Sequence, residues 1–240
     1  MRDSDVQDLL QHVDDDLTTI KDSYERALRN KDVPAALRID IKNAMENLRS
    51  ALDYMAQDVA EVIVAPHRSI SNLKAVRRVY FPYGKDKQAF EDSSQRNLPD
   101  LQTLNLRVFD IIAAIQPHTC GAMWLYDFCS ILNDNKHDAL SPQERTQRQS
   151  YKVGRTGGGP AISAPAGAIK APPGAISIGG APVVFDPTTG VPLQTPGIDV
   201  EVTTWVSFKF KDSHVEVYPL LETAARGVRR TSELLYEELK

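Results

Sequence analysis

The sequence predicts an α+β protein that is mainly α, an antiparallel helical bundle with a small antiparallel β-sheet insertion and a C-terminal helix. Two observations predict this class. Apolar residues recur every three or four positions over most of residues 1–140, as in helices with one buried face. Over residues 199–211 they alternate with polar residues instead, as in a strand with one buried face.

The domain organisation follows from where these two patterns change. A chain of 240 residues is long enough to bury the core of one large domain. We expect a single domain, 1–240, in which residues 1–140 form the helical bundle. Residues 149–218 form a Gly/Pro-rich β excursion, and residues 219–240 form a C-terminal helix that returns to the bundle.

The central element is predicted to be a helix over residues 33–64. Pro34 fits its first turn, where the missing N–H costs nothing, and Pro66 lies just beyond its end. Its apolar positions form one continuous stripe that faces a core. The stripe consists of Leu37, Ile41, Met45, Leu48, Leu52, Met55, Val59 and Ile63.

The other elements come from the same periodicities. We expect further helices over residues 4–29, 85–96, 99–116, 121–135 and 219–239, and strands over residues 79–82, 199–211 and 214–218. The core should then contain Leu48, Leu52, Met55, Trp124, Phe128 and Leu132.

Composition excludes several classes of protein. Hydrophobic residues make up 42% and charged residues 25%, which is typical of a globular chain, and the net charge of −4 disfavours binding of duplex DNA by charge alone. The sequence has neither an apolar run long enough to span a membrane nor a secretory leader pattern, so we expect a cytoplasmic protein without a membrane partner. Cys120 and Cys129 have no partners at metal-ligand spacing, so we expect free thiols, no metal and no cofactor.

Polar residues flank the apolar stripe of the central helix. Arg49 and Asp53 are four residues apart on one flank, whereas Asn47 and Tyr54 lie on the other. In an arbitrary helix, such a pair is an exposed ion pair that contributes only a few tenths of a kcal/mol. The alternative is a site, and a second polar cluster favours it.

This second cluster ends the helix over residues 121–135. Asn133, Lys136 and His137 follow a strongly apolar stretch, although a lone His there is more often a partner of the helix dipole. A polar residue beside a buried stripe needs a partner or access to water. We therefore expect one neighbourhood that contains Arg49, Asp53, Asn133, Lys136 and His137, with Asn47 and Tyr54 at its margin.

The order of the helices and the segment 49–54 resemble the HEPN superfamily of helical bundles. The signature of that family is Arg, four to six residues, and then His; here Tyr54 stands where the His is expected. The segment 132–137 is also similar to a motif of uncharacterised bacterial proteins that carry Leu-Arg-Ser-Ala-Leu-Asp in a helix. The resemblance covers residues 1–140, and the β excursion has no counterpart in it.

The resemblance implies a homodimer and, for many members of the family, a metal-independent ribonuclease of toxin–antitoxin or defence systems. Tyr54, with an ordinary pKa of about 10, is a poor base at neutral pH. His137 would then replace the missing His in proton transfer, while Arg49 and Lys136 stabilise the charge of a phosphate. The binding residues would be Asn47, Asp53, Tyr54 and Asn133.

Three functions remain open at this stage. The favoured one is a non-catalytic HEPN-like binding or interaction protein, in which the polar cluster is a hydrogen-bond network that fixes the register of the helices. The second is a metal-independent ribonuclease with RNA as its partner. The third is a small-molecule site at the junction of bundle and sheet.

Overall fold

The computed structural model describes residues 1–30, 35–76, 78–137, 143–169, 171–172, 175–210 and 214–240. The chain is mainly helical, with a small antiparallel sheet and a C-terminal helix, which confirms the predicted fold class. It divides into two compact units, a helical unit (Met1–Gln143, Phe210–Lys240) and a β unit (Glu144–Lys209).

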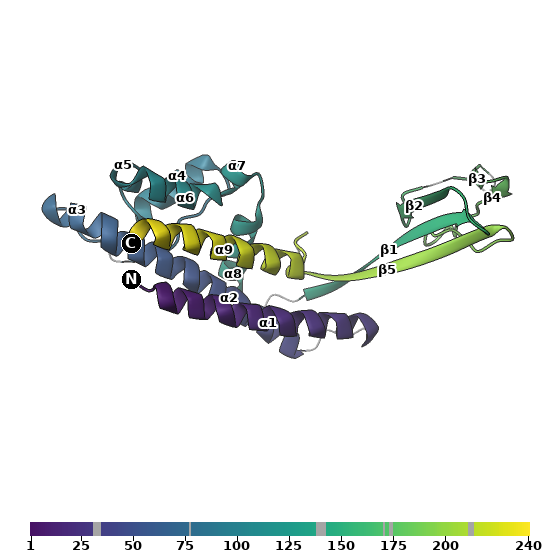
Figure 1. Cartoon of the computed structure of the whole chain (residues 1–240), viewed down its shortest axis with the longest axis horizontal. Coiled ribbons are helices and arrows are strands. Elements are labelled where there is room, and N and C mark those ends of the chain that lie inside the picture. The colour runs from purple at the N-terminus through teal and green to yellow at the C-terminus, as the bar shows by residue number, and fades with distance from the viewer. Residues whose placement is uncertain (31–34, 77, 138–142, 170, 173–174, 211–213) are drawn as a thin grey trace. The chain divides into compact units, whose positions relative to one another are not determined.

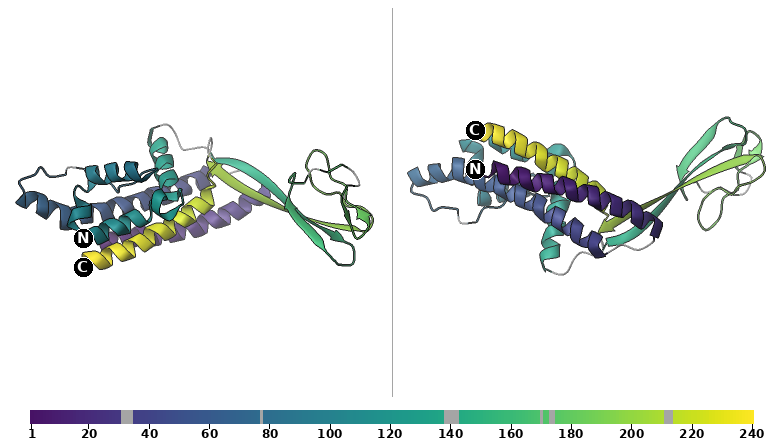
Figure 2. Two further views of the ribbon diagram at one scale, coloured as in Figure 1. Left: turned by 90° about the horizontal axis from the view of Figure 1, so that it is seen from above. Right: turned by 60° about the horizontal axis from the view of Figure 1, so that its bottom comes forward.

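The helical unit is organised around α2 (Ala35–Val59), which contacts α1 (Asp3–Asn30), α8 (Trp124–His137) and α9 (Val217–Leu239). In Figures 1 and 2, α1, α2 and α9 run side by side, so the C-terminal helix belongs to the bundle as expected. The expected core residues Leu48, Leu52, Met55, Phe128 and Leu132 are buried, and Trp124 is half-buried.

The central helix does not end where the sequence predicts. After Val59 it continues through a π-helical turn, η1 (Ala60–Val64), into α3 (Ala65–Ile70). Pro66 is therefore inside the helical stretch rather than beyond it. The π turn accommodates the proline within the helical stretch. The N–H of Ala65 bonds to the oxygen of Ala60, and Pro66 falls in the first turn of α3, where its missing N–H costs nothing.

The segment after α3 is not the strand expected over residues 79–82. Its backbone N–H groups bond to side chains instead of to another strand: Tyr80 donates to Oδ1 of Asn97 at 3.1 Å and Phe81 to Oδ1 of Asp53 at 2.8 Å. The next helix, α4 (Lys87–Asn97), begins where Asp86 accepts a hydrogen bond from the N–H of Ala89.

The single helix expected over residues 99–116 is broken. It consists of α5 (Leu101–Leu104) and α6 (Leu106–Ala114), and α7 (Pro117–Cys120) follows. Asn105 is extended between α5 and α6, and its side chain accepts a hydrogen bond from the N–H of Val108. An Asn that caps the following helix competes with continuation of the preceding one, which explains the break.

The β unit contains two small sheets. The larger sheet has the order β2-β1-β5, with β1 antiparallel to β2 and Tyr151 opposite Ala164. The smaller pairs β3 with β4. The strands are β1 (Gln143–Arg155), β2 (Ala161–Pro165), β3 (Ser177–Ile178), β4 (Ala181–Pro182) and β5 (Ile198–Phe210).

The β unit has a hydrophobic core of its own. The core residues are Tyr151, Val153, Ile178, Val183 and Ile198. We expected a sheet added to the side of one domain, whereas the structure gives the excursion a separate core and begins it at residue 144 rather than 149.

The second strand expected over residues 214–218 is absent from the described residues. The helix α9 begins at Val217 instead, two residues before the predicted start at Pro219. A proline is tolerated in the first turn of a helix, because the N–H groups there have no partner within the helix.

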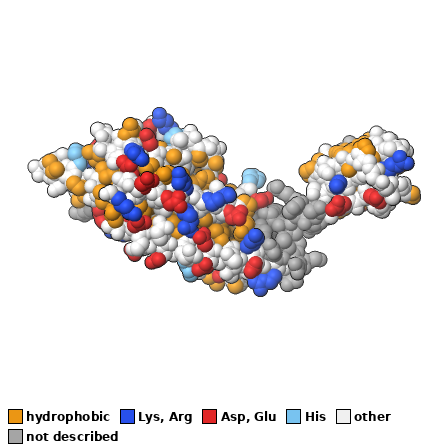
Figure 3. All heavy atoms as spheres, viewed as in Figure 1, with side chains coloured by type: hydrophobic (Ala, Val, Ile, Leu, Met, Phe, Trp, Pro, Cys, Tyr) orange, Lys and Arg blue, Asp and Glu red, His pale blue; other side chains and the backbone are white. Residues whose placement is uncertain are grey.

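The visible face of the helical unit carries charged side chains of both signs, interspersed rather than separated (Figure 3). Within the described part of the chain, no helix combines the length and the apolar character needed to cross a membrane.

Candidate functional site

Arg49 is the centre of a polar cluster between α2, α8 and the segment 81–84. Its Nε donates to Oδ2 of Asp53 at 3.2 Å, and its Nη1 donates to Sγ of Cys129 at 2.9 Å. The guanidinium carbon lies 5.3 Å from the centre of the Tyr83 ring, which is the distance of a cation–π contact. Tyr83 also accepts a hydrogen bond from Nδ2 of Asn133 at 2.8 Å. We call these five residues the Arg49 cluster.

The segment 81–84 is fixed by further buried contacts. The fully buried Gln116 donates from Nε2 to the oxygen of Pro82 at 3.0 Å and accepts from the N–H of Gly84 at 3.3 Å. Gly84 is required by close packing, because a Cβ there would lie 2.2 Å from the backbone N of Phe90. The ring of Tyr83 is therefore held over Arg49 by a rigid backbone.

The electrostatics of the cluster follow from its burial. Burial lowers the pKa of Arg49, but its contacts with Cys129 and Asp53 outweigh this effect and leave the pKa above its ordinary value. Burial raises the pKa of the Tyr83 phenol. The side chains of Arg49 and Asp53 are only 14% and 18% exposed, so the cluster holds a charged guanidinium beside a neutral phenol, largely out of water.

The structure brings together some of the residues predicted for the site. Arg49, Asp53 and Asn133 meet as expected, although a role in binding or catalysis stays a prediction. Asn47 and Tyr54 lie on the other flank of α2, about 140–160° around the helix axis from Arg49. The side chains of Lys136 and His137 lie outside the part that the structure describes, so their predicted roles stay predictions.

Two members of the cluster escaped sequence reasoning. Tyr83 directly follows the strand predicted over residues 79–82, and Cys129 was expected only as a free thiol. Cys129 is indeed buried and outside any disulfide, but its sulfur contacts a cation. A signal was present for Cys129, which is four residues before Asn133 and therefore on the same face of α8.

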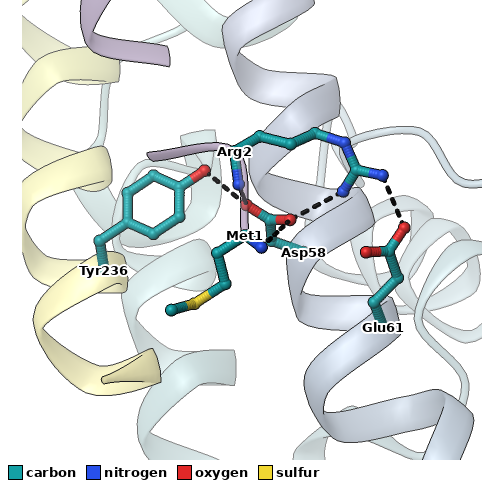
Figure 4. Close-up of polar contacts among 5 residues, drawn as sticks. All are labelled: Met1, Arg2, Asp58, Glu61 and Tyr236. Carbon is teal, nitrogen blue, oxygen red and sulfur yellow. Dashed lines mark hydrogen bonds and ion pairs between the residues drawn. The ribbon is translucent and has the colours of Figure 1, made fainter. Parts of the chain in front are cut away.

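A second polar cluster surrounds Asp58, which is nine residues after Arg49 and therefore on the opposite flank of α2. Figure 4 shows this cluster. Asp58 is completely buried and accepts hydrogen bonds from the backbone N–H of Arg2 at 2.5 Å and from Nη1 of Arg2 at 2.7 Å. It also accepts one from the Tyr236 hydroxyl at 2.9 Å. Arg2 pairs at the same time with Glu61 at 2.6 Å, and the N-terminal nitrogen of Met1 is 4.0 Å from Asp58. We call these five residues the Asp58 cluster.

The hydrogen bonds of the Asp58 cluster link separate parts of the chain. Burial and the hydrogen bond to Asp58 raise the pKa of Tyr236 far above its ordinary value, and the hydrogen bond to Glu61 raises the pKa of Arg2. Tyr236 and Arg2 therefore keep their protons and donate them in hydrogen bonds within the protein. The cluster joins the chain start, α2 and α9.

The described residues include no group of three or more His, Cys, Asp or Glu side chains that could hold a metal ion. Comparison with known proteins adds no relatives, since no protein-family model, curated protein or solved structure matches the chain. The resemblance to the HEPN superfamily therefore stays a prediction.

Proposed function

We propose that this chain is a non-catalytic helical binding or interaction protein, in which the Arg49 cluster fixes the packing of the helices. The proposal rests on one observation: the Arg49 guanidinium already has partners within the protein. Its Nε and Nη1 bond to Asp53 and Cys129, and one face of it stacks on Tyr83. A phosphate group would have to displace these partners from a site that is largely shielded from water.

A ribonuclease also needs a group that moves a proton. Burial raises the pKa of Tyr83, so this phenol stays protonated at neutral pH and does not supply the phenolate that would accept a proton. Asp53 already accepts hydrogen bonds from Arg49 and from the N–H of Phe81. These commitments support a network that serves stability rather than chemistry.

A metal-independent ribonuclease of the toxin–antitoxin or defence type is the second candidate. The feature that favours it is the length of α8, which continues to His137, four residues after the exposed Asn133. Self-association through the helices, as the HEPN resemblance implies, would bring two copies of the Arg49 cluster into one assembly. Both ideas stay proposals.

Incubation of the purified wild type with single-stranded RNA, with and without Mg²⁺, separates the two candidates. The proposal predicts intact RNA in every sample. Cleavage by the wild type that disappears in Arg49→Ala, with the melting temperature retained, would contradict it and establish the ribonuclease. Arg96→Ala is the matched control, because Arg96 is an exposed arginine on another helix.

A further inference from the structure

A cavity of about 610 Å³ lies between the helical stretch α2–η1–α3 and residues 73–76 and 78–80. Its wall is mostly apolar and includes Ala60 and Val64 of the π turn together with Leu73 and Val79 of the facing segment. Cavities for small molecules in proteins commonly measure about 300–1,000 Å³ and have largely apolar walls. We call this space the π-helix cavity.

The π turn is part of the cavity wall rather than a remote irregularity. The residues whose backbones close the π hydrogen bond, Ala60 and Ala65, both line the cavity, and their small side chains leave room in it. Single π turns inside α-helices recur at functional sites, where they change which side chains face a ligand.

The residues that line the cavity carry more positive than negative charge. Arg78 is exposed, lines the cavity and, among the described residues, has no hydrogen bond or ion pair. Arg68 lines it as well, with Nε bonded to the oxygen of Lys74 at 2.7 Å. The only acid among the lining residues, Glu61, is already paired with Arg2 at 2.6 Å.

We propose that the π-helix cavity binds a small amphipathic carboxylate, with its apolar body against Val64 and Leu73 and its carboxylate on Arg78. An apolar wall with one uncommitted guanidinium at its edge matches a ligand that has one anionic end. A peptide helix fits less well, since a groove for a helix presents a row of apolar anchor positions, whereas this cavity has an arginine at its edge. This inference gives the proposed binding role a ligand class, and its site is separate from the Arg49 cluster.

Isothermal titration calorimetry with three probes tests the ligand class. Decanoate has both parts of the proposed ligand, decanol lacks the charge, and butyrate lacks most of the apolar body. We expect the wild type to bind decanoate more tightly than either of the others. Arg78→Gln should weaken decanoate binding about tenfold and leave decanol binding unchanged. Arg96→Gln, which removes an equivalent exposed charge elsewhere, should change neither.

A second variant tests the location. Ala65→Trp places a large ring in the cavity from an exposed position, so it should abolish decanoate binding while the melting temperature stays the same. If this variant does not fold, Ala75→Trp fills the cavity from the facing segment.

Three binding results would overturn the proposal. They are no binding of decanoate by the wild type, equal binding of decanoate and decanol, and binding that survives both cavity-filling variants. Light scattering that shows a dimer in the wild type and a monomer in Ala65→Trp would also overturn it, because a second copy of the chain would then occupy the cavity. None of these results bears on RNA cleavage, so the proposed function is tested separately.

Discussion

At the scale of single residues, Asp58 is a completely buried acid of the helical unit and needs hydrogen-bond donors around it. A carboxylate with no exposure to water is tolerated only when charged and polar donors surround it. Arg2 and Tyr236 supply these donors from distant parts of the chain. The helical unit therefore depends on Asp58 for stability more than on any exposed charge.

Two substitutions quantify this dependence. Asp58→Ala leaves Arg2 and Tyr236 without their buried partner and should lower the free energy of unfolding by about 3–5 kcal/mol. Tyr236→Phe removes one hydrogen bond and should cost about 0.5–1.5 kcal/mol. Chemical denaturation measures both. Asp110→Ala, at an exposed acid, is the control and should change stability by less than about 0.5 kcal/mol.

Sequence reasoning could place Arg49 beside Asp53 and expect Asn133 nearby, since helical spacing and the need for partners are local rules. It could not find Tyr83 or Gln116. Their roles depend on how the segment 81–84 folds back over α2, which no local pattern encodes.

At the scale of elements, α8 and α9 are joined by a contact between a glycine and an indole. A Cβ on Gly227 would lie 2.5 Å from Cζ2 of Trp124, so the ring of Trp124 occupies the space beside the glycine. Alanine is normally favoured over glycine in a helix by about 1 kcal/mol. Here the steric effect should exceed this preference.

We therefore expect Gly227→Ala to lower the free energy of unfolding by about 1–3 kcal/mol, through displacement of Trp124. In the background of Trp124→Leu, the same substitution should become neutral or stabilising, because the opposing ring is gone. Denaturation of the two single variants and the double variant gives the coupling. A Gly227→Ala protein more stable than the wild type would contradict the packing of α8 on α9.

The turn at Asp186 gives the β unit a dependence on pH. Its Oδ1 accepts hydrogen bonds from the N–H groups of Thr189 at 2.7 Å and Thr188 at 2.9 Å. The bonds from Thr189 are the chief reason that the pKa of Asp186 lies below its ordinary value of 3.8. A depressed pKa in the folded state contributes stability above pH 3.8, and this contribution is lost as the pH falls through the folded-state pKa.

An NMR titration of the Thr189 amide from pH 7 to pH 2 measures this pKa directly. The amide signal should move with a midpoint below 3.8, and Asp186→Asn should remove the titration while retaining an acceptor oxygen. A midpoint at or above 3.8 would mean that the hydrogen bonds do not form in solution.

Element types were more predictable than element boundaries. The 3-4 spacing of apolar residues identified α1, α2, α8 and α9, and strict alternation identified β5. The strand β1 was missed, because its first half, residues 143–149, is polar throughout and has no alternation. The π turn and the break at Asn105 were missed because hydrogen bonds decide them, not hydrophobic pattern.

At the scale of the whole molecule, the two hydrophobic cores should respond to mutation independently. Leu52→Ala removes a fully buried side chain of the helical unit and should cost about 2–5 kcal/mol. Tyr151→Ala removes the largest side chain of the β core. Because the cores are separate, each substitution should weaken only its own unit.

Hydrogen exchange followed by mass spectrometry resolves the two units by peptide. Leu52→Ala should accelerate exchange in α2 and leave the peptides of β1 unchanged, and Tyr151→Ala should do the reverse. Equal acceleration in both units, from either variant, would favour the single domain that the sequence suggested.

The proposed role of the Arg49 cluster is to hold the helical unit together rather than to perform chemistry. The most direct measurement is the free energy of unfolding of Arg49→Ala in chemical denaturation, with Arg96→Ala as control. Loss of the guanidinium leaves Asp53 and Cys129 without their charged partner, so the account predicts a decrease of about 2–3 kcal/mol, against less than about 0.5 kcal/mol for the control. An Arg49→Ala protein as stable as the Arg96→Ala protein would contradict the account.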